Sequence, residues 1–108
     1  MAATKIPDPR EVWPRRLKAA RQAAGLSQRE LGIAAGIEAS VASTRVNRYE
    51  VGVHQADYQI AVHLAEALNV PVAYLYCDDE ELASILVALH RASATLRRRV
   101  IKLALEQE

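Results

Sequence analysis

The segment from Ser27 to Gly52 constrains the fold of this chain more than any other. Ser27 and Glu30 stand three positions apart before an apolar pattern, a spacing typical of a capping box, in which each side chain bonds the backbone amide of the other residue. Gly36 interrupts that pattern and suits the positive φ of a tight turn, where a side chain would be strained. The segment therefore predicts two short helices joined by a glycine turn.

Helical patterns also lie on both sides of this segment. Pro14 suits the first position of a helix and Gly25 suits its end, so a first helix is expected from about residue 14 to residue 24. Asp57 can cap a fourth helix, and Pro71 can begin a short fifth one. Five helices are thus expected before the end of the first three-quarters of the chain.

Residues 78–108 carry two further amphipathic stripes. The first has apolar residues at i, i+3, i+4 and i+7, a spacing that places them on one helix face: Leu82, Ile85, Leu86 and Leu89. The second follows Ser93 or Thr95 as its cap and contains Leu96, Val100, Leu103 and Ala104. We therefore predict an all-α fold with a flexible arm over residues 1–12, a five-helix domain over residues 13–77, and two C-terminal amphipathic helices over residues 78–108.

Length and composition restrict the class of protein. With 108 residues, 51% of them hydrophobic, the chain can form one helical domain. No apolar run approaches the ~20 residues that cross a membrane, and the N-terminal residues lack the apolar segment of a signal peptide. Cys77 is the single cysteine, so an internal disulfide is excluded. These features favour the cytoplasm.

Charge is distributed unevenly along the chain. Residues 1–56 contain nine lysines and arginines against five acidic residues, whereas residues 57–108 contain five against eight. A basic half suggests an anionic partner, and ordinary surface charge explains the numbers equally well. Charge alone does not separate these two interpretations.

A spaced set of residues runs through the first 77 positions in a recognisable order. The set is Leu17-Lys18-x-x-Arg21-x-x-x-Gly25-Leu26-Ser27-Gln28-x-x-Leu31-Gly32-x-x-x-Gly36-Ile37, then Val46-Asn47-Arg48-Tyr49-Glu50-x-Gly52, then Ala65-x-Ala67-Leu68-Asn69-Val70-Pro71 and Tyr74-Leu75-Tyr76. It resembles the Cro/repressor-type (Xre-like) helix-turn-helix family, whose members are five-helix DNA-binding domains of phage and bacterial regulators. The resemblance covers about residues 14–77 and implies a repressor-like domain whose third helix, about residues 42–50, enters the major groove.

One departure from the family pattern concerns the length of this third region. Gly36 and Gly52 are sixteen positions apart, about four more than the pattern has, which is close to one helical turn. Without an insertion, a buried slot would fall on Arg45, and an unpaired buried arginine is very costly. With an insertion, Val46 and Tyr49 take the buried slots. The added residues lengthen either the turn or the start of the helix, with Ser40 or Ser43 as the cap in the second case.

The resemblance also implies which side chains meet DNA. Arginine and asparagine can form paired hydrogen bonds with guanine and adenine, and hydroxyls can reach base edges. The residues expected to read bases are Ser43, Thr44, Arg45 and Asn47. The residues expected to contact phosphates are Gln28, Arg29, Arg48, His54 and Gln55. Two alternatives stay open: Gln28 could brace a side chain of the recognition helix, and Arg48 could pair with Glu50.

We expect these features to make a sequence-specific, double-stranded DNA-binding transcriptional regulator, acting as a repressor on a roughly palindromic operator. The two C-terminal helices either fold back on their own core or pair with a second copy, and we favour the homodimer. The alternative is an antitoxin-type protein whose residues 78–108 bind a partner protein. No nucleophile–base pair or phosphate loop suggests an enzyme, three isolated histidines and one cysteine lack zinc-ligand spacing, and no cofactor is expected.

Overall fold

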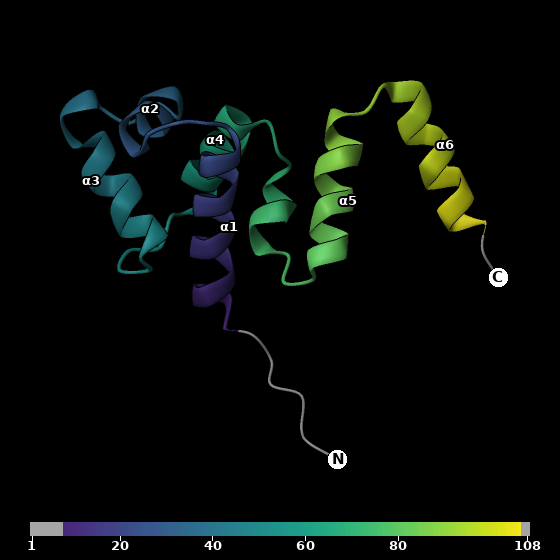
Figure 1. Cartoon of the computed structure of the whole chain (residues 1–108), viewed down its shortest axis with the longest axis horizontal. Coiled ribbons are helices and arrows are strands. Elements are labelled where there is room, and N and C mark those ends of the chain that lie inside the picture. The colour runs from purple at the N-terminus through teal and green to yellow at the C-terminus, as the bar shows by residue number, and fades with distance from the viewer. Residues whose placement is uncertain (1–7, 107–108) are drawn as a thin grey trace, which may run out of the picture.

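The computed structural model describes residues 8–106, and within them the chain forms six α-helices, one 3-10 helix and no strand. The elements are α1 (Pro9–Ala23), α2 (Gln28–Ala34), α3 (Ala39–Glu50), α4 (Tyr58–Leu68), the 3-10 helix η1 (Val72–Tyr76), α5 (Glu80–Arg91) and α6 (Ala94–Leu105). Figure 1 shows α1 to α4 gathered on one side, α5 beside them, and α6 at the far end of the molecule. The predicted all-α class is confirmed. No helix in residues 8–106 is both long and apolar enough to span a bilayer.

The first helix begins earlier than the sequence predicted. It starts at Pro9, and Pro14 lies inside it, although an internal proline removes one backbone hydrogen bond. Val12 and Trp13 are 4% and 8% exposed, so packing of the first turns against the core compensates for that loss. Residues 9–12, expected to belong to a flexible arm, are therefore helical, and residues 1–7 lie outside the described residues.

The core draws on all five N-terminal elements. Each of α1, α2, α3, α4 and η1 supplies one large side chain that is fully buried, and these are Leu17, Leu31, Val46, Leu64 and Leu75 respectively. Burying such a side chain contributes about 1.5–3 kcal/mol. Because the five contributions meet in one cluster, the positions of α2 and α3 are set by the whole five-element domain.

Helices α2 and α3 approach each other very closely. The predicted capping box is confirmed: the Glu30 amide donates to Ser27 Oγ at 2.9 Å, and the Ser27 amide donates to Glu30 Oε1 at 2.8 Å. A Cβ atom placed on Gly32 would lie 2.7 Å from the Cβ of Ala42. Only a glycine facing a small residue allows this crossing.

The added residues lengthen α3 and leave the turn short. Helix α3 starts at Ala39, directly after its cap residue Glu38, whose side chain makes no capping bond. The prediction of Ser40 or Ser43 as the cap is therefore wrong, because both lie inside the helix. Val46 and Tyr49 are buried as predicted. About four residues add close to one turn, which keeps both ends of the apolar pattern on the same face.

Helix α5 is held to the five-element domain at both ends. At its start, Glu80 forms ion pairs with Arg15 at 2.8 Å and Arg16 at 3.0 Å. At its end, Arg91 donates to the carbonyl oxygens of Asn69 and Leu68, at 2.9 and 3.3 Å. Helix α5 therefore keeps a defined position beside the domain.

The predicted apolar stripe of α5 is only partly covered, with Leu86 and Leu89 half-buried. Ala83 is buried and Val87 packs on the core, whereas Leu82 and Ile85 are 52% and 46% exposed. Helix α6 begins at Ala94, and its cap is Ser93, one of the two caps considered, whose hydroxyl accepts from the Leu96 amide. None of the residues of α6 is buried. The two C-terminal stripes thus remain largely uncovered within one chain.

Candidate nucleic-acid interface

The exposed face of α3 carries most of the residues predicted to read bases. Ser43, Thr44 and Asn47 are exposed, whereas the opposite face is pinned by the buried Ala42, Val46 and Tyr49. This division follows from the helical period of 3.6 residues. The structure therefore presents a rigid helix with a polar outer side.

Arg45 lies on the flank of this outer face. Its Nη2 donates to Tyr49 Oη at 2.8 Å, and its guanidinium carbon lies 5.9 Å from the centre of the Tyr49 ring, within the range of a cation–π contact. Tyr49 in turn packs edge-on against Trp13, with 6.1 Å between ring centroids. Arg45 is therefore held along the helix and would have to leave Tyr49 before it could reach a base.

Gln28 is joined to α3 by its side-chain amide. Its Nε2 donates to Asn47 Oδ1 at 3.1 Å and to Glu50 Oε1 at 3.2 Å. Both partners are acceptors, so the amide group of Gln28 must present its nitrogen to them. Asn47 can then still offer its own Nδ2 as a donor. This geometry favours the bracing role considered for Gln28.

A buried ion pair ties α1 to the end of α3. Arg21 Nε and Nη2 lie 2.6 and 3.0 Å from the two carboxylate oxygens of Glu50, and Arg21 Nη1 donates to the carbonyl of Leu26. The Glu50 side chain is only 2% exposed. Hydrogen bonding to Glu50 raises the pKa of Arg21, against the opposite effect of its burial.

This pair corrects one alternative from the sequence. Glu50 pairs with Arg21 and not with Arg48, whose side chain is exposed. The sequence identifies Arg21 only as a member of the family pattern and assigns it no partner. The available signal was Glu50 itself, because a carboxylate next to a buried helix stripe needs a cation that can reach it.

The other predicted phosphate contacts lie at two places on the surface. Arg29 is exposed in the first turn of α2, and His54 and Gln55 are exposed in the loop between α3 and α4. That loop closes onto α3, because the amides of Val53 and His54 donate to the carbonyl of Arg48 at 3.0 and 3.3 Å.

Ser40 is a further candidate residue on this face that the sequence analysis did not propose as a contact. It is exposed in the first turn of α3, and it precedes Thr44 and Asn47 by four and seven positions, so all three follow one helix face. Sequence reasoning considered it only as a cap. The signal was present in the alternative that lengthened the helix, which adds a turn at this end.

Comparisons with known proteins agree with this geometry. The family profile described as "Helix-turn-helix" matches residues 17–75. The crystal structure of the transcriptional regulator BswR is similar, with 35% sequence identity and a TM-score of 0.79 over 87% of this chain and 93% of that one. A search of curated protein sequences finds no match. Since the profile covers more than half of the chain, the chain belongs to the Cro/repressor-type (Xre-like) helix-turn-helix family of DNA-binding transcriptional regulators.

Proposed function

We propose that this regulator binds a roughly palindromic operator as a homodimer and represses transcription by occupying it. The observation that carries the proposal is the polar outer face of α3, which is pinned by a buried stripe on its other side. The backbone of such a helix fits the major groove without rearrangement. We propose that it works in the cytoplasm and catalyses no reaction.

Base reading is assigned to the outer face of α3. Thr44 and Asn47 lie at its centre, Ser43 and Arg45 lie on its flanks, and Ser40 extends it by one turn toward the start of the helix. Hydroxyl and amide groups of this kind match base edges in the major groove. Arg45 also reads a base, after its hydrogen bond with Tyr49 is replaced by one with that base.

Phosphate contacts are assigned to residues around this face: Gln28, Arg29, Arg48, His54 and Gln55. Arg29 and Arg48 supply positive charge, which gives affinity and a salt dependence that do not vary with sequence. Gln28 acts mainly by holding Asn47 in place. His54 and Gln55 can donate hydrogen bonds to phosphate oxygens.

The homodimer is proposed from the C-terminal helices. Six large apolar side chains of α5 and α6 are at least 38% exposed: Leu82, Ile85, Leu96, Ile101, Leu103 and Leu105. An isolated helix of twelve residues is marginal in water, and α6 has that length with no buried residue. A second copy provides a matching apolar surface. Since α5 is fixed to the domain at both ends, such a dimer holds two α3 helices at a set spacing, about 34 Å for adjacent half-sites.

Selection of bound sequences from a random DNA pool tests binding, symmetry and spacing together. We expect an inverted repeat whose half-sites are about one helical turn apart. The matched control is the Thr44→Ala, Asn47→Ala double variant, which keeps the buried stripe and should select a weaker consensus, with the preference lost at the bases that these two residues contact. Recovery of a single unrepeated site would contradict the dimer, and failure to enrich any sequence would contradict specific binding.

The same uncovered helices favour one alternative, an antitoxin-type protein whose residues 78–108 clasp a partner protein while the domain binds DNA. The two proposals differ in the state of the free protein. A chain that sediments as a monomer at micromolar concentration, with α6 unfolded by circular dichroism, would favour the partner protein. A neighbouring toxin gene would support it further.

A further inference from the structure

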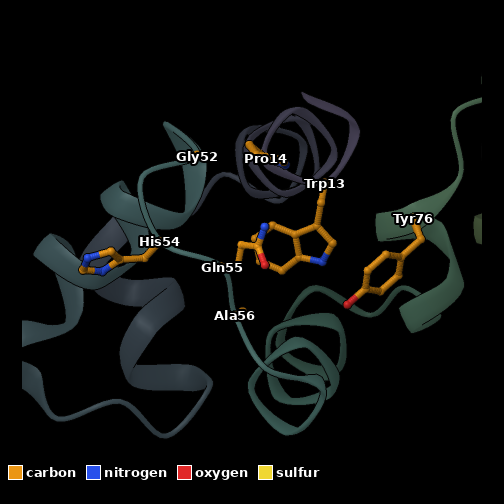
Figure 2. A pocket seen from close by; sticks show the side chains of 7 residues that line it. All are labelled: Trp13, Pro14, Gly52, His54, Gln55, Ala56 and Tyr76. Atoms are coloured by element: carbon orange, nitrogen blue, oxygen red, sulfur yellow. The ribbon is translucent and has the colours of Figure 1, made fainter. Parts of the chain in front are cut away.

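A pocket of about 220 Å³ lies where the start of α1, the loop between α3 and α4, and η1 meet. Its lining includes Trp13 and Pro14 from α1, Gln55 and Ala56 from the loop, and Tyr76 from η1 (Figure 2). None of the predicted base-reading residues lines it. The pocket is therefore distinct from the outer face of α3.

The pocket wall contains a buried hydrogen-bond donor without a partner. Among the described residues, Trp13 Nε1 is inaccessible to solvent and bonds to no acceptor, whereas buried indole nitrogens usually have one. In Figure 2 this nitrogen lies on the edge of the indole that faces Tyr76. Tyr76 is 52% exposed, so its side chain has room to turn, and a movement of this kind is required before the indole N–H can meet an occupant of the pocket.

The lining defines the chemistry of that occupant. The Trp13 ring, Pro14 and Ala56 form apolar walls, and the Gln55 amide and the Tyr76 hydroxyl add polar groups at the edges. The remaining polar side chain, His54, points away from the indole (Figure 2). A cavity of about 150 Å³ holds one benzene ring, so this pocket has room for one ring with a small substituent. We propose that it binds a small neutral aromatic molecule whose oxygen atom accepts a hydrogen bond from Trp13 Nε1.

A molecule in this pocket would contact two parts of the domain that hold the recognition helix α3 in place: Trp13 and the loop between α3 and α4. Trp13 packs against Tyr49, whose hydroxyl holds Arg45. The loop that carries Gln55 is bonded to the carbonyl of Arg48, and Gln55 is itself a proposed phosphate contact. Binding therefore withdraws Gln55 from DNA and disturbs the end of α3. This second step, a loss of operator affinity, rests on the proposed function.

Benzamide is a suitable probe, because it is neutral, has one ring and carries a carbonyl acceptor. Trp13 is the only tryptophan, so the full-length chain gives a single indole N–H signal in a ¹H–¹⁵N spectrum and a single tryptophan fluorophore. We expect saturable movement of that signal with benzamide at millimolar concentration, and cross-relaxation between the probe ring and the indole proton. Toluene, which lacks an acceptor, should bind about tenfold more weakly. Absence of a saturable shift, or equal binding of toluene, overturns the proposal.

A pair of variants checks the location. Ala56→Leu fills the pocket and should weaken benzamide binding by about tenfold, since the added side chain takes the space of the ring. Ala73→Leu, at an exposed position of η1, should bind benzamide as the wild type does. Equal binding by a folded Ala56→Leu variant places the probe elsewhere. If Ala56→Leu does not fold, the cross-relaxation measurement on the wild-type chain decides the location.

The coupling to DNA is measured separately, so its outcome is distinguishable from that of the proposed function. Benzamide at saturation should raise the Kd for the selected operator by about threefold or more in the wild type and leave it unchanged in Ala56→Leu. An unchanged Kd in the wild type overturns the coupling. Failure of the ligand-free chain to bind any operator contradicts the proposed function instead, and leaves the benzamide measurements intact.

Discussion

At the scale of single residues, the outer face of α3 is organised by the side chains behind it. Glu50 accepts hydrogen bonds from Arg21 and Gln28, and Gln28 also donates one to Asn47. Tyr49 holds Arg45 from the other flank. Two of the proposed base-reading residues are therefore positioned by hydrogen bonds to other side chains of the domain.

Arg45 and Arg48 should differ in the kind of DNA affinity they supply. Arg45→Ala should lose about 1–3 kcal/mol of discrimination at one base position. Arg48→Ala should weaken binding to all sequences and reduce the salt slope by about one. Titration of operator and mutated-operator duplexes at several salt concentrations separates the two effects. An unchanged base preference in Arg45→Ala would remove that residue from the reading set.

Loss of the Glu50 carboxylate should leave Arg21 without its partner. Removing one member of a buried pair costs about 3–5 kcal/mol, and because the Arg21 side chain is 14% exposed we expect the lower end for Glu50→Ala. Urea unfolding of Glu50→Ala, Arg21→Met and the double variant measures this. The double variant should be more stable than the sum of the single changes predicts; simple additivity would show that the pair is not coupled.

At the scale of elements, the crossing of α2 and α3 depends on two small residues. Gly32→Ala introduces a contact of 2.7 Å with Ala42, and overpacking of this kind destabilises by about 1–3 kcal/mol. Adding Ala42→Gly removes the opposing Cβ. The second glycine by itself costs about 1 kcal/mol in a helix. The double variant should nevertheless be more stable than the sum of the two single changes predicts. If Gly32→Ala and the wild type unfold with the same denaturant midpoint, α2 and α3 do not cross as closely as the 2.7 Å contact implies.

The attachment of α5 should depend on pH. Hydrogen bonds from Arg16 and then Arg15 lower the pKa of Glu80. A lowered pKa stabilises the folded state at pH values above the pKa of the unfolded chain, which is about 4.3 for glutamate. That stabilisation is lost as the pH falls through the pKa of Glu80 in the folded protein. Wild type should therefore exceed Glu80→Gln in stability at neutral pH and converge with it in acid.

Thermal unfolding of both proteins between neutral pH and pH 3 measures this convergence. Glu81→Gln, one position along on the same exposed turn, is the matched control and should follow the wild type. A constant difference between wild type and Glu80→Gln across the range would show that the charge of Glu80 does not attach α5.

At the scale of the whole molecule, one chain leaves its C-terminal surface uncovered. Leu82 is 52% exposed on α5, so Leu82→Glu should leave the protomer folded while it disrupts the proposed interface between copies. We expect a monomer by sedimentation and a weaker affinity for the two-half-site operator. Ala88→Glu, exposed on another face of α5, should remain dimeric. A wild-type chain that is already monomeric at micromolar concentration would rule out the homodimer.

Local chemistry alone determined several features of this protein. The capping box, the turn at Gly36 with its φ of +87°, and the burial of Val46 and Tyr49 each depend on residues close together in the chain or on the helical period. For the same reason, the family pattern and most of the outer face of α3 could be predicted from the sequence.

Only the tertiary structure decided the features that join distant residues. The packing of Val12 and Trp13 moved the start of α1 to Pro9. The sequence left open whether the added residues lengthen the turn or the helix, and the structure starts α3 at Ala39. The partners of Glu50 lie 29 and 22 positions away along the chain. No local pattern selects Arg21 over Arg48, because burial and reach are properties of the assembled helices.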